Sequence, residues 1–253
     1  MSALDTPVYH RFLAKLRPPN LAESIVVDVG AGDGRNTAPW LAWGFKRVVA
    51  VDAVCASLAR FRQRIRRQHP AWLDRILMVE CDARQIPLSS AQADIVIAIE
   101  SLYYLNEDYP RGLAECVRIM KPNGRIFLAE RSWEGALLAR LLYSGVGAML
   151  SIAKSRDMWD GGMQDSVRSR CFTETELIAM LRGRGLEPLE VKGIPLLPLI
   201  LGYLRSQGSL KRGDGKLLGR LGHLLQDLGE HGQMRRTYAV VAAKASARVR
   251  ARQ

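Results

Sequence analysis

The chain has 253 residues, of which 48% are hydrophobic and 25% charged. This composition excludes an intrinsically disordered protein, because such chains lack the apolar residues that a core needs. The length suits one large α/β domain with insertions, or one domain with a small cap. The formal net charge of +12 is compatible with a nucleic-acid partner, an anionic membrane surface or an acidic substrate, and does not choose among them.

The cysteines predict neither a zinc site nor a disulfide framework, because no two of them form a CxxC pair. They are Cys55, Cys81, Cys116 and Cys171. We expect no bound metal, and scattered thiols of this kind suit a reducing cytoplasm. Residues 1–15 lack the basic start and continuous apolar core of a signal peptide, so a cytoplasmic protein is expected.

The first element in chain order is a short amphipathic helix over residues 9–16, which Pro18 and Pro19 end. This helix either folds over a ligand or only covers a sheet. The stretch from Ile25 to Gly34 follows. It consists of a buried strand that runs into three glycines at alternate positions. Glycines let a backbone approach a ligand, and the next helix offers unpaired N–H groups. The stretch predicts a nucleotide-binding turn, the alternative being a Gly-rich turn without a ligand.

Spacing and charge indicate which ligand this turn binds. A dinucleotide fold has its third glycine five places after the first, whereas Gly34 lies four places after Gly30 and Arg35 occupies the fifth place. Asp28, two residues before the first glycine, would repel a pyrophosphate. It would attract a ligand that carries a sulfonium and an ammonium group. Both features favour S-adenosylmethionine over NAD.

The second expected strand, residues 47–52, ends on Asp52, which lies 20 residues after Gly32. An acid at that distance sits at the end of the neighbouring parallel strand, where it can accept hydrogen bonds from both ribose hydroxyls. The alternative role is a helix N-cap. A helix over residues 54–68 follows and carries five crowded arginines, which indicate either a solvated face or a polyanion footprint. They are Arg60, Arg62, Arg64, Arg66 and Arg67.

Three further strands are expected at residues 76–80, 93–99 and 125–130, with a helix over 109–120. At this point a resemblance to the class I S-adenosylmethionine-dependent methyltransferases, in their small-molecule branch, is plain. It rests on the segments VDVGAGDG, VVAVD, VECDA, ADIVIAIESLYYL and RIMKPNGRIFLAE, and resumes at CFTETEL. It covers residues 22–131 and continues from Cys171.

The resemblance implies an α/β fold with a Rossmann-like, doubly wound, seven-stranded and mostly parallel sheet. Further strands are expected near 186–191 and 236–243, the last one antiparallel, within one domain spanning 1–243. Carried over position by position, the glycine turn passes the methionine end, Asp52 holds the ribose, and Asp82 with Ala83 reads the adenine. The expected cofactor-binding residues are Asp28, Gly30, Ala31, Gly32, Asp52, Ala53, Asp82, Ala83, Glu100 and Ser101.

Two insertions, residues 132–170 and 192–235, depart from the compact family pattern and are expected to form a substrate cap. Each carries an apolar stretch, at 136–153 and 193–204. These stretches suit the wall of an apolar pocket or a subunit contact such as a homodimer, with a lipid surface as a third choice. Neither is expected to span a membrane. The basic tail, residues 244–253, is expected to be disordered and solvated.

Methyl transfer from a sulfonium is an in-line displacement, so positioning supplies much of the acceleration and no obvious general base is required. Candidates for substrate contact are Tyr104, Glu130, Arg131, Trp133, Trp159 and Asp160. Each also has a structural reading, as core aromatic or ion-pair partner. The sequence predicts a methyltransferase acting on O, N or C of a small, partly apolar or anionic metabolite. The alternatives are an RNA- or ribosome-directed enzyme, or a non-catalytic cofactor-binding partner subunit.

Overall fold

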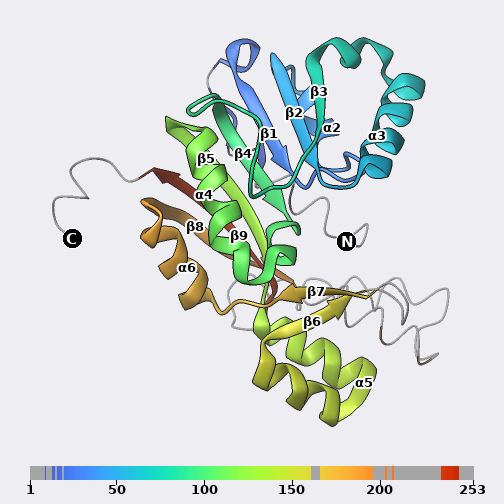
Figure 1. Ribbon diagram of the computed structural model, residues 1–253, viewed down its shortest axis with the longest axis vertical. Helices are drawn as coiled ribbons and strands as arrows, with labels where there is room; N and C mark the ends of the chain where they lie inside the picture. The colour runs from blue at the N-terminus through green and yellow to red at the C-terminus, as the bar shows by residue number, and fades with distance from the viewer. Residues whose placement is uncertain are drawn as a thin grey trace, which may run out of the picture.

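The computed structural model describes residues 20–160, 166–195 and 235–244, together with 9, 13, 14, 16–18, 203 and 207. Figure 1 shows a sheet flanked by helices. Its strands are β1 (Ile25–Val29), β2 (Arg47–Asp52), β3 (Ile76–Glu80), β4 (Ala93–Ile99), β5 (Met120–Arg131), β8 (Leu186–Pro195) and β9 (Arg235–Lys244), and a separate hairpin pairs β6 (Asp157–Asp160) with β7 (Val167–Arg170). The α-helices are α2 (Ala38–Ala42), α3 (Cys55–Gln68), α4 (Tyr109–Ile119), α5 (Trp133–Ser155) and α6 (Glu174–Gly183), and the 3-10 helices are η1 (Leu21–Glu23), η2 (Pro70–Arg75) and η3 (Leu102–Asp108).

The seven-stranded sheet has the order β3-β2-β1-β4-β5-β9-β8. The pairs from β3 across to β5 are parallel, whereas β9 runs antiparallel to both of its neighbours. This confirms the predicted fold class and the antiparallel last strand. The strand order reverses direction between β1 and β4, and in open α/β sheets ligands bind beyond the carboxyl ends of the strands at such a point.

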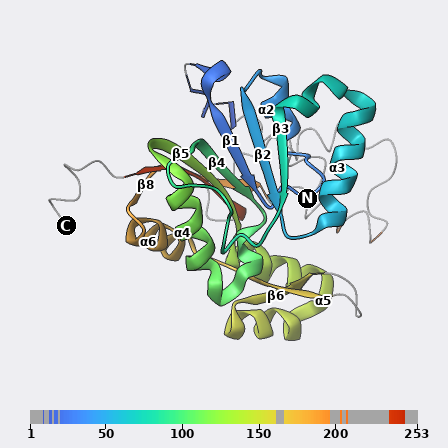
Figure 2. The same cartoon turned by 45° about the horizontal axis from the view of Figure 1, so that its top comes forward.

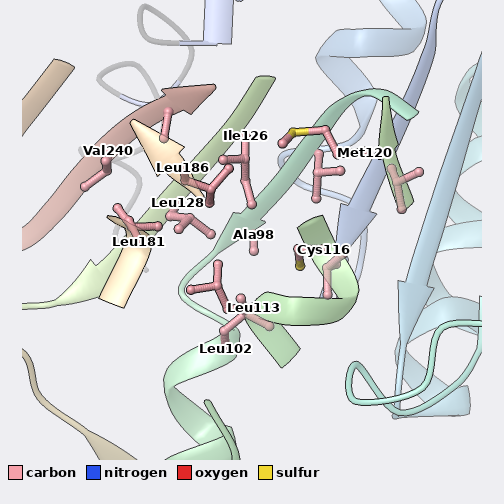
Figure 3. Packing of buried hydrophobic residues seen from close by; sticks show 14 of the residues in the cluster. Ala98, Leu102, Leu113, Cys116, Met120, Ile126, Leu128, Leu181, Leu186 and Val240 are labelled. Carbon is pink, nitrogen blue, oxygen red and sulfur yellow. The ribbon is translucent and has the colours of Figure 1, made fainter. Parts of the chain in front are cut away.

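Side chains from the two faces of the sheet enter two separate cores. On β5, Ile126 and Leu128 point to one face, while Phe127 and Ala129 point to the other, as the period of two requires. Figure 3 shows the first core, where Leu128 and Ala98 meet Leu113 of α4 and Leu181 of α6. Trp40 of α2 and Phe61 of α3 fill the second core. Both faces are therefore covered, which explains why the central strands are almost wholly apolar.

Several predicted boundaries shift by a few residues. Residues 121–124, which lie between the expected helix over 109–120 and the expected strand at 125–130, belong to β5, whose pairing with β4 changes register between Ala93 and Ile95. The CFTETEL segment, where the resemblance resumes, begins α6: the Thr173 hydroxyl accepts from the Glu176 N–H at 3.3 Å, and the Glu176 carboxylate accepts from the Thr173 N–H, which forms a capping box.

The first insertion folds into α5 and the β6–β7 hairpin, which lie beyond the carboxyl ends of the parallel strands in both Figure 1 and Figure 2. The hairpin was not foreseen from the sequence. Most of the second insertion and the tail beyond Lys244 lie outside the described residues. Of the predicted N-terminal helix, the buried side chains Tyr9, Leu13 and Leu16 pack into the core that contains Trp40 and Phe61.

Candidate functional site

Two adjoining cavities open at the carboxyl ends of the strands. One, here called the β2–β3 cavity, has a volume of about 620 Å³ and is lined by residues that follow β2 and β3, among them Asp52, Ala53, Asp82 and Ala83. The other, here called the cap cavity, has a volume of about 480 Å³ and is lined mainly by the glycine turn, η3, the end of β5, α5 and β6. Both cavities share four lining residues, which are Gly30, Glu100, Tyr104 and Asp160. These four residues mark the junction between the cavities.

The glycine turn forms the floor of this junction. Gly30 has a φ of +77°, a conformation that L side chains rarely adopt, and a Cβ added there would lie 2.2 Å from the Cβ of Ser101. The N–H groups of Gly30 and Ala31 both donate to the carbonyl of Val51, at 2.8 and 3.0 Å. The turn therefore needs glycine at this position for its backbone conformation. It also needs glycine for its close approach to Ser101, which follows β4 together with Glu100; these two residues are here called the β4 exit.

Asp52 lies in the β2–β3 cavity at the end of β2. Its two carboxylate oxygens accept from the N–H groups of Gly32 at 2.7 Å and Val54 at 2.8 Å. These bonds join the turn after β1 to the start of α3, so Asp52 is held in place by backbone donors. A carboxylate has about four acceptor sites, and two backbone bonds leave capacity for the hydroxyls of a ribose.

Asp82 also lines the β2–β3 cavity, beside Ala83. The Arg84 guanidinium donates to both of its oxygens, with Nε at 3.0 Å from each, and donates to Asp108 as well. The hydrogen bond from Arg84 holds the pKa of Asp82 below its usual range. Asp82 is therefore an ionised acceptor in a fixed orientation, as adenine recognition through its amino group would require. The sequence offered no signal for the role of Arg84.

The β4 exit consists of Glu100 and Ser101. Glu100 has a φ of +52°, a strained conformation of the kind that clusters at functional sites. Its N–H donates to the Ala129 carbonyl at 2.9 Å, and its carboxylate accepts from the Tyr9 hydroxyl at 3.0 Å. The Ser101 hydroxyl donates to the Val29 carbonyl at 2.7 Å, which ties the β4 exit to the end of β1. An N-terminal residue thus reaches the candidate site.

Asp28 and Gly32 do not line either cavity, although both were expected at the cofactor. Asp28 is 2% exposed and accepts a hydrogen bond from the Thr37 hydroxyl at 2.5 Å. Burial, opposed by that hydrogen bond, raises the pKa of Asp28 to about 7. Asp28 therefore stabilises the glycine turn through its hydrogen bond with Thr37, which lies in the segment after the turn. Asp28 does not contact either cavity, so the glycine turn separates its charge from any ligand there.

The raised pKa of Asp28 predicts a pH-dependent stability. The folded state binds this proton up to about pH 7, whereas the unfolded chain releases it near pH 4. Stability from this group is thus fully present below about pH 4 and is lost as pH rises to about 7, by roughly 4 kcal/mol at most. Asp28→Asn keeps an acceptor for Thr37 without the charge. We expect its melting temperature to exceed that of the native chain progressively as pH rises from about 4 to 8. A melting-temperature difference between Asp28→Asn and the native chain that stays constant across this pH range would contradict the raised pKa of Asp28.

An ion pair dominates the cap cavity. Arg131, at the end of β5, donates to Asp160 of β6 at 3.0 Å through Nη1, and its Nη2 lies 2.8 Å from the other carboxylate oxygen. Ser169 of β7 also binds both partners. The Tyr104 hydroxyl donates to Asp160 at 3.1 Å. Burial and the charge of Asp160 raise the pKa of Tyr104, so its phenol remains a hydrogen-bond donor at neutral pH.

The other predicted substrate contacts lie away from the cavities. Glu130 is fully buried and lines neither cavity; Tyr109 donates to it at 3.1 Å, and burial raises its pKa well above the usual range. Trp159 is 55% exposed and lines neither cavity. Trp133 packs beneath Arg156, whose guanidinium lies 4.9 Å from the ring centroid. Of the six candidates, the structure thus brings Tyr104, Arg131 and Asp160 together in the cap cavity.

Sequence reasoning missed several residues that shape the site. Tyr103 lies under the Arg131 guanidinium, with 4.7 Å between the guanidinium carbon and the ring centroid, and it lines the cap cavity. It directly precedes Tyr104, so the paired tyrosines after β4 were the available signal. Asn36 also lines the cap cavity, and its buried Oδ1 has no hydrogen-bond partner among the described residues. Within that same part of the chain, no group of three or more His, Cys, Asp or Glu side chains is placed to hold a metal ion.

Comparisons with known proteins agree with this geometry. Residues 27–128 match the family model described as a methyltransferase domain. A malonyl-[acyl-carrier protein] O-methyltransferase from Halorhodospira halophila is 31% identical over 64% of this chain and 53% of its own length. A ubiquinone biosynthesis O-methyltransferase from Rhodopseudomonas palustris is 28% identical over 69% of this chain and 62% of its own length. The match thus spans little more than half of these curated relatives.

A solved structure extends the likeness to nearly the whole chain. It is the Burkholderia thailandensis 1,6-didemethyltoxoflavin-N1-methyltransferase with bound 1,6-didemethyltoxoflavin and S-adenosylhomocysteine. The alignment has a TM-score of 0.58 and 19% identity, and covers 96% of this chain and 78% of that one, so it shows a shared fold. The family model and the sequence relatives lead to one conclusion: residues 27–128 match a methyltransferase domain, and the chain is similar to enzymes that are named as methyltransferases.

Proposed function

We propose that this chain transfers the methyl group of S-adenosylmethionine to a small acceptor held in the cap cavity. The observation that carries this proposal is the pair of cavities that meet at Gly30, Glu100, Tyr104 and Asp160. A donor in one cavity and an acceptor in the other would face each other only at that junction. Holding two reactants in this way replaces an encounter in solution with a positioned reaction.

The β2–β3 cavity fits the methyl donor. The glycine turn lets the backbone approach without a side chain, Asp52 retains acceptor capacity, and Asp82 is an oriented acceptor at the far side. When bound, S-adenosylmethionine supplies a methyl group that is already activated by its positive sulfur. Gly30 and Ala31 would lie along its methionine end, Asp52 would hold the ribose, and Asp82 with Ala83 would contact the adenine. Asp28 would act through the turn.

The cap cavity indicates the chemical character of the acceptor. The Tyr104 phenol is a donor and the Asp160 carboxylate is an acceptor, and both lie at the junction. Arg131 fixes the carboxylate and adds positive charge. Ala136, Ala139 and Met158 supply an apolar wall. These groups suit a small molecule with a hydroxyl, acid or amino group at the junction and an apolar part against α5. Asp160 is already bound by Arg131, Ser169 and Tyr104, and it would act by orienting the Tyr104 phenol and the acceptor at the junction.

Both cited relatives are named as O-methyltransferases, which makes oxygen the first acceptor atom to test. Purified protein would be incubated with methyl-labelled S-adenosylmethionine and a panel of hydroxylated, carboxylic and amino metabolites. Bulk tRNA would be included as a separate arm. The proposal predicts S-adenosylhomocysteine release together with a labelled small molecule. Label in tRNA alone would support an RNA-directed enzyme instead, and donor binding without turnover on any arm would support a non-catalytic partner subunit.

Asp52→Ala is expected to weaken S-adenosylmethionine binding by about a hundredfold, because two hydrogen bonds to a charged acceptor are lost. Isothermal titration calorimetry would measure the dissociation constant, and thermal melting would separate binding loss from unfolding. Asp74→Ala is a matched control, since Asp74 is an exposed aspartate outside both cavities. Equal affinities of Asp52→Ala and Asp74→Ala would remove the ribose role from Asp52.

A further inference from the structure

The helix α5 is strongly apolar, yet little of it is buried. An 18-residue window within its 23 residues has a mean hydropathy of 1.6, and only 11% of that window is buried. By length and composition alone, α5 is the one helix among the described residues that could cross a membrane. A helix with so much apolar surface is normally buried in a core or in lipid. Most of α5 is covered by neither in this structure.

A bend makes α5 unsuited to crossing a bilayer. Gly145 has a φ of +84° and a ψ of 178°, values that interrupt the helix and leave two shorter helical segments. At 1.5 Å per residue, each segment of roughly ten residues reaches only about 15–18 Å, against about 30 Å of hydrocarbon. A bent apolar helix of this size can lie in a membrane interface without spanning it.

The exposed apolar side chains lie on both sides of the bend. Tyr143 is 50% exposed, Val146 58% and Leu150 51%. Trp159 of the neighbouring hairpin is 55% exposed. Figures 1 and 2 both place α5 and the β6–β7 hairpin together beyond the sheet. The exposed residues thus belong to a single protruding unit, and aromatic side chains such as these are typical of membrane interfaces.

The charge of α5 favours an anionic surface. Besides Glu134, whose carboxylate accepts from the Tyr238 hydroxyl at 2.7 Å, the charged residues of α5 are Arg140 and Lys154. Arg140 donates to the Trp159 carbonyl at 3.0 Å, which leaves its charge uncompensated by that contact. The whole chain carries a formal charge of +12. Basic residues beside an apolar face add electrostatic attraction to anionic lipids.

We propose that the exposed apolar side chains around the bend of α5, which are Leu141, Tyr143, Val146 and Leu150, dock on a lipid bilayer that contains anionic headgroups. The first two turns of the same helix line the cap cavity through Gly135, Ala136 and Ala139. Docking would therefore bring the cap cavity close to the bilayer. In so far as the proposed function holds, an acceptor with an apolar part could reach that cavity from the lipid phase.

Flotation of the full chain with extruded vesicles tests this surface. The vesicles would consist of phosphatidylcholine alone or of phosphatidylcholine mixed with phosphatidylglycerol. We expect the chain to float with the mixed vesicles. The double variant Val146→Ser/Leu150→Ser should reduce its partitioning about tenfold or more, because two apolar side chains lose their transfer free energy. The matched control is Leu77→Ser/Leu189→Ser, which removes two leucines that are 46% and 56% exposed elsewhere, and it should float like the native chain.

Vesicle binding is measured without methyl transfer. A chain that does not bind vesicles can therefore still transfer methyl groups, and a chain that binds vesicles can still lack methyl transfer. S-adenosylmethionine affinity, measured in parallel, should be equal in both double variants. Absence of flotation with either kind of vesicle would overturn the proposal, as would equal loss in the test and control variants. Tyr143 packs edge-on against Tyr203 at 5.7 Å between ring centroids. If the chain is instead a dimer that dissociates on Val146→Ser/Leu150→Ser and binds no lipid, these exposed side chains of α5 form a protein contact and the lipid proposal is wrong.

Discussion

Gly30→Ala is expected to abolish detectable binding of S-adenosylmethionine and to lower the melting temperature. The new Cβ would lie 2.2 Å from the Ser101 Cβ and 2.9 Å from its hydroxyl oxygen, in a backbone conformation with a φ of +77°. The Ser101 hydroxyl holds the β4 exit to the Val29 carbonyl, so relief of the clash must move the turn, the β4 exit, or both. Either movement displaces the junction of the two cavities.

The measurement is calorimetric titration with S-adenosylmethionine, alongside thermal melting. Gly183→Ala is the matched control, because Gly183 ends α6 with nothing within 4 Å of an added Cβ and no positive φ. We expect that control to bind normally and to melt at the native temperature or slightly above it. Native affinity in Gly30→Ala would mean that the ligand does not pass this turn.

Asp160→Ala is expected to have the second largest effect, and to act on turnover more than on donor affinity. It removes the carboxylate at the junction and leaves Arg131, whose side chain is only 18% exposed, without its ion-pair partner. Loss of one partner from a fully buried pair costs about 3–5 kcal/mol; with Asp160 itself 28% exposed, we expect about 2 kcal/mol. We expect turnover to fall about a hundredfold, because the Tyr104 hydroxyl loses the partner that orients it at the junction, and misplaced groups at a reaction site can cost this much.

A double-mutant cycle separates the two effects. Arg131→Met removes the unpaired charge, so Asp160→Ala/Arg131→Met should regain stability relative to Asp160→Ala alone. Turnover should stay low in the double variant, because the junction still lacks its acceptor. Trp159→Ala, one residue away but exposed and outside both cavities, should turn over at the native rate. Full recovery of turnover in the double variant would limit Asp160 to a structural role.

The meeting of Asp52, Asp82 and the β4 exit at the β2–β3 cavity could be predicted from the sequence, because these residues are tied to strand ends. Each follows an apolar strand, and parallel strands bring their carboxyl ends to one edge. The fold class followed from the same alternation of strands and helices. Asp28 shows where this reasoning stops. Its position in the sequence fits a ligand contact, yet its side chain is buried and accepts a hydrogen bond from the Thr37 hydroxyl.

The arrangement of the cap cavity could not be predicted in the same way. Arg131, Asp160, Ser169 and Tyr104 come from four separate elements, and their contacts depend on how the insertion folds back over the sheet. No local pattern encodes the β6–β7 hairpin that delivers Asp160 to Arg131. Composition did show that residues 136–153 are apolar, but only the bend at Gly145 shows that the stretch is divided between lining a cavity and facing outward.

A crystal structure with S-adenosylhomocysteine tests the central claim most directly. The claim predicts the adenosyl group in the β2–β3 cavity, with the ribose hydroxyls on Asp52 and the adenine beside Asp82 and Ala83. The sulfur should lie at the junction of Gly30, Glu100, Tyr104 and Asp160, directed towards the cap cavity. A nucleoside bound in the cap cavity, or a sulfur directed away from Tyr104 and Asp160, would contradict the assignment of donor and acceptor cavities.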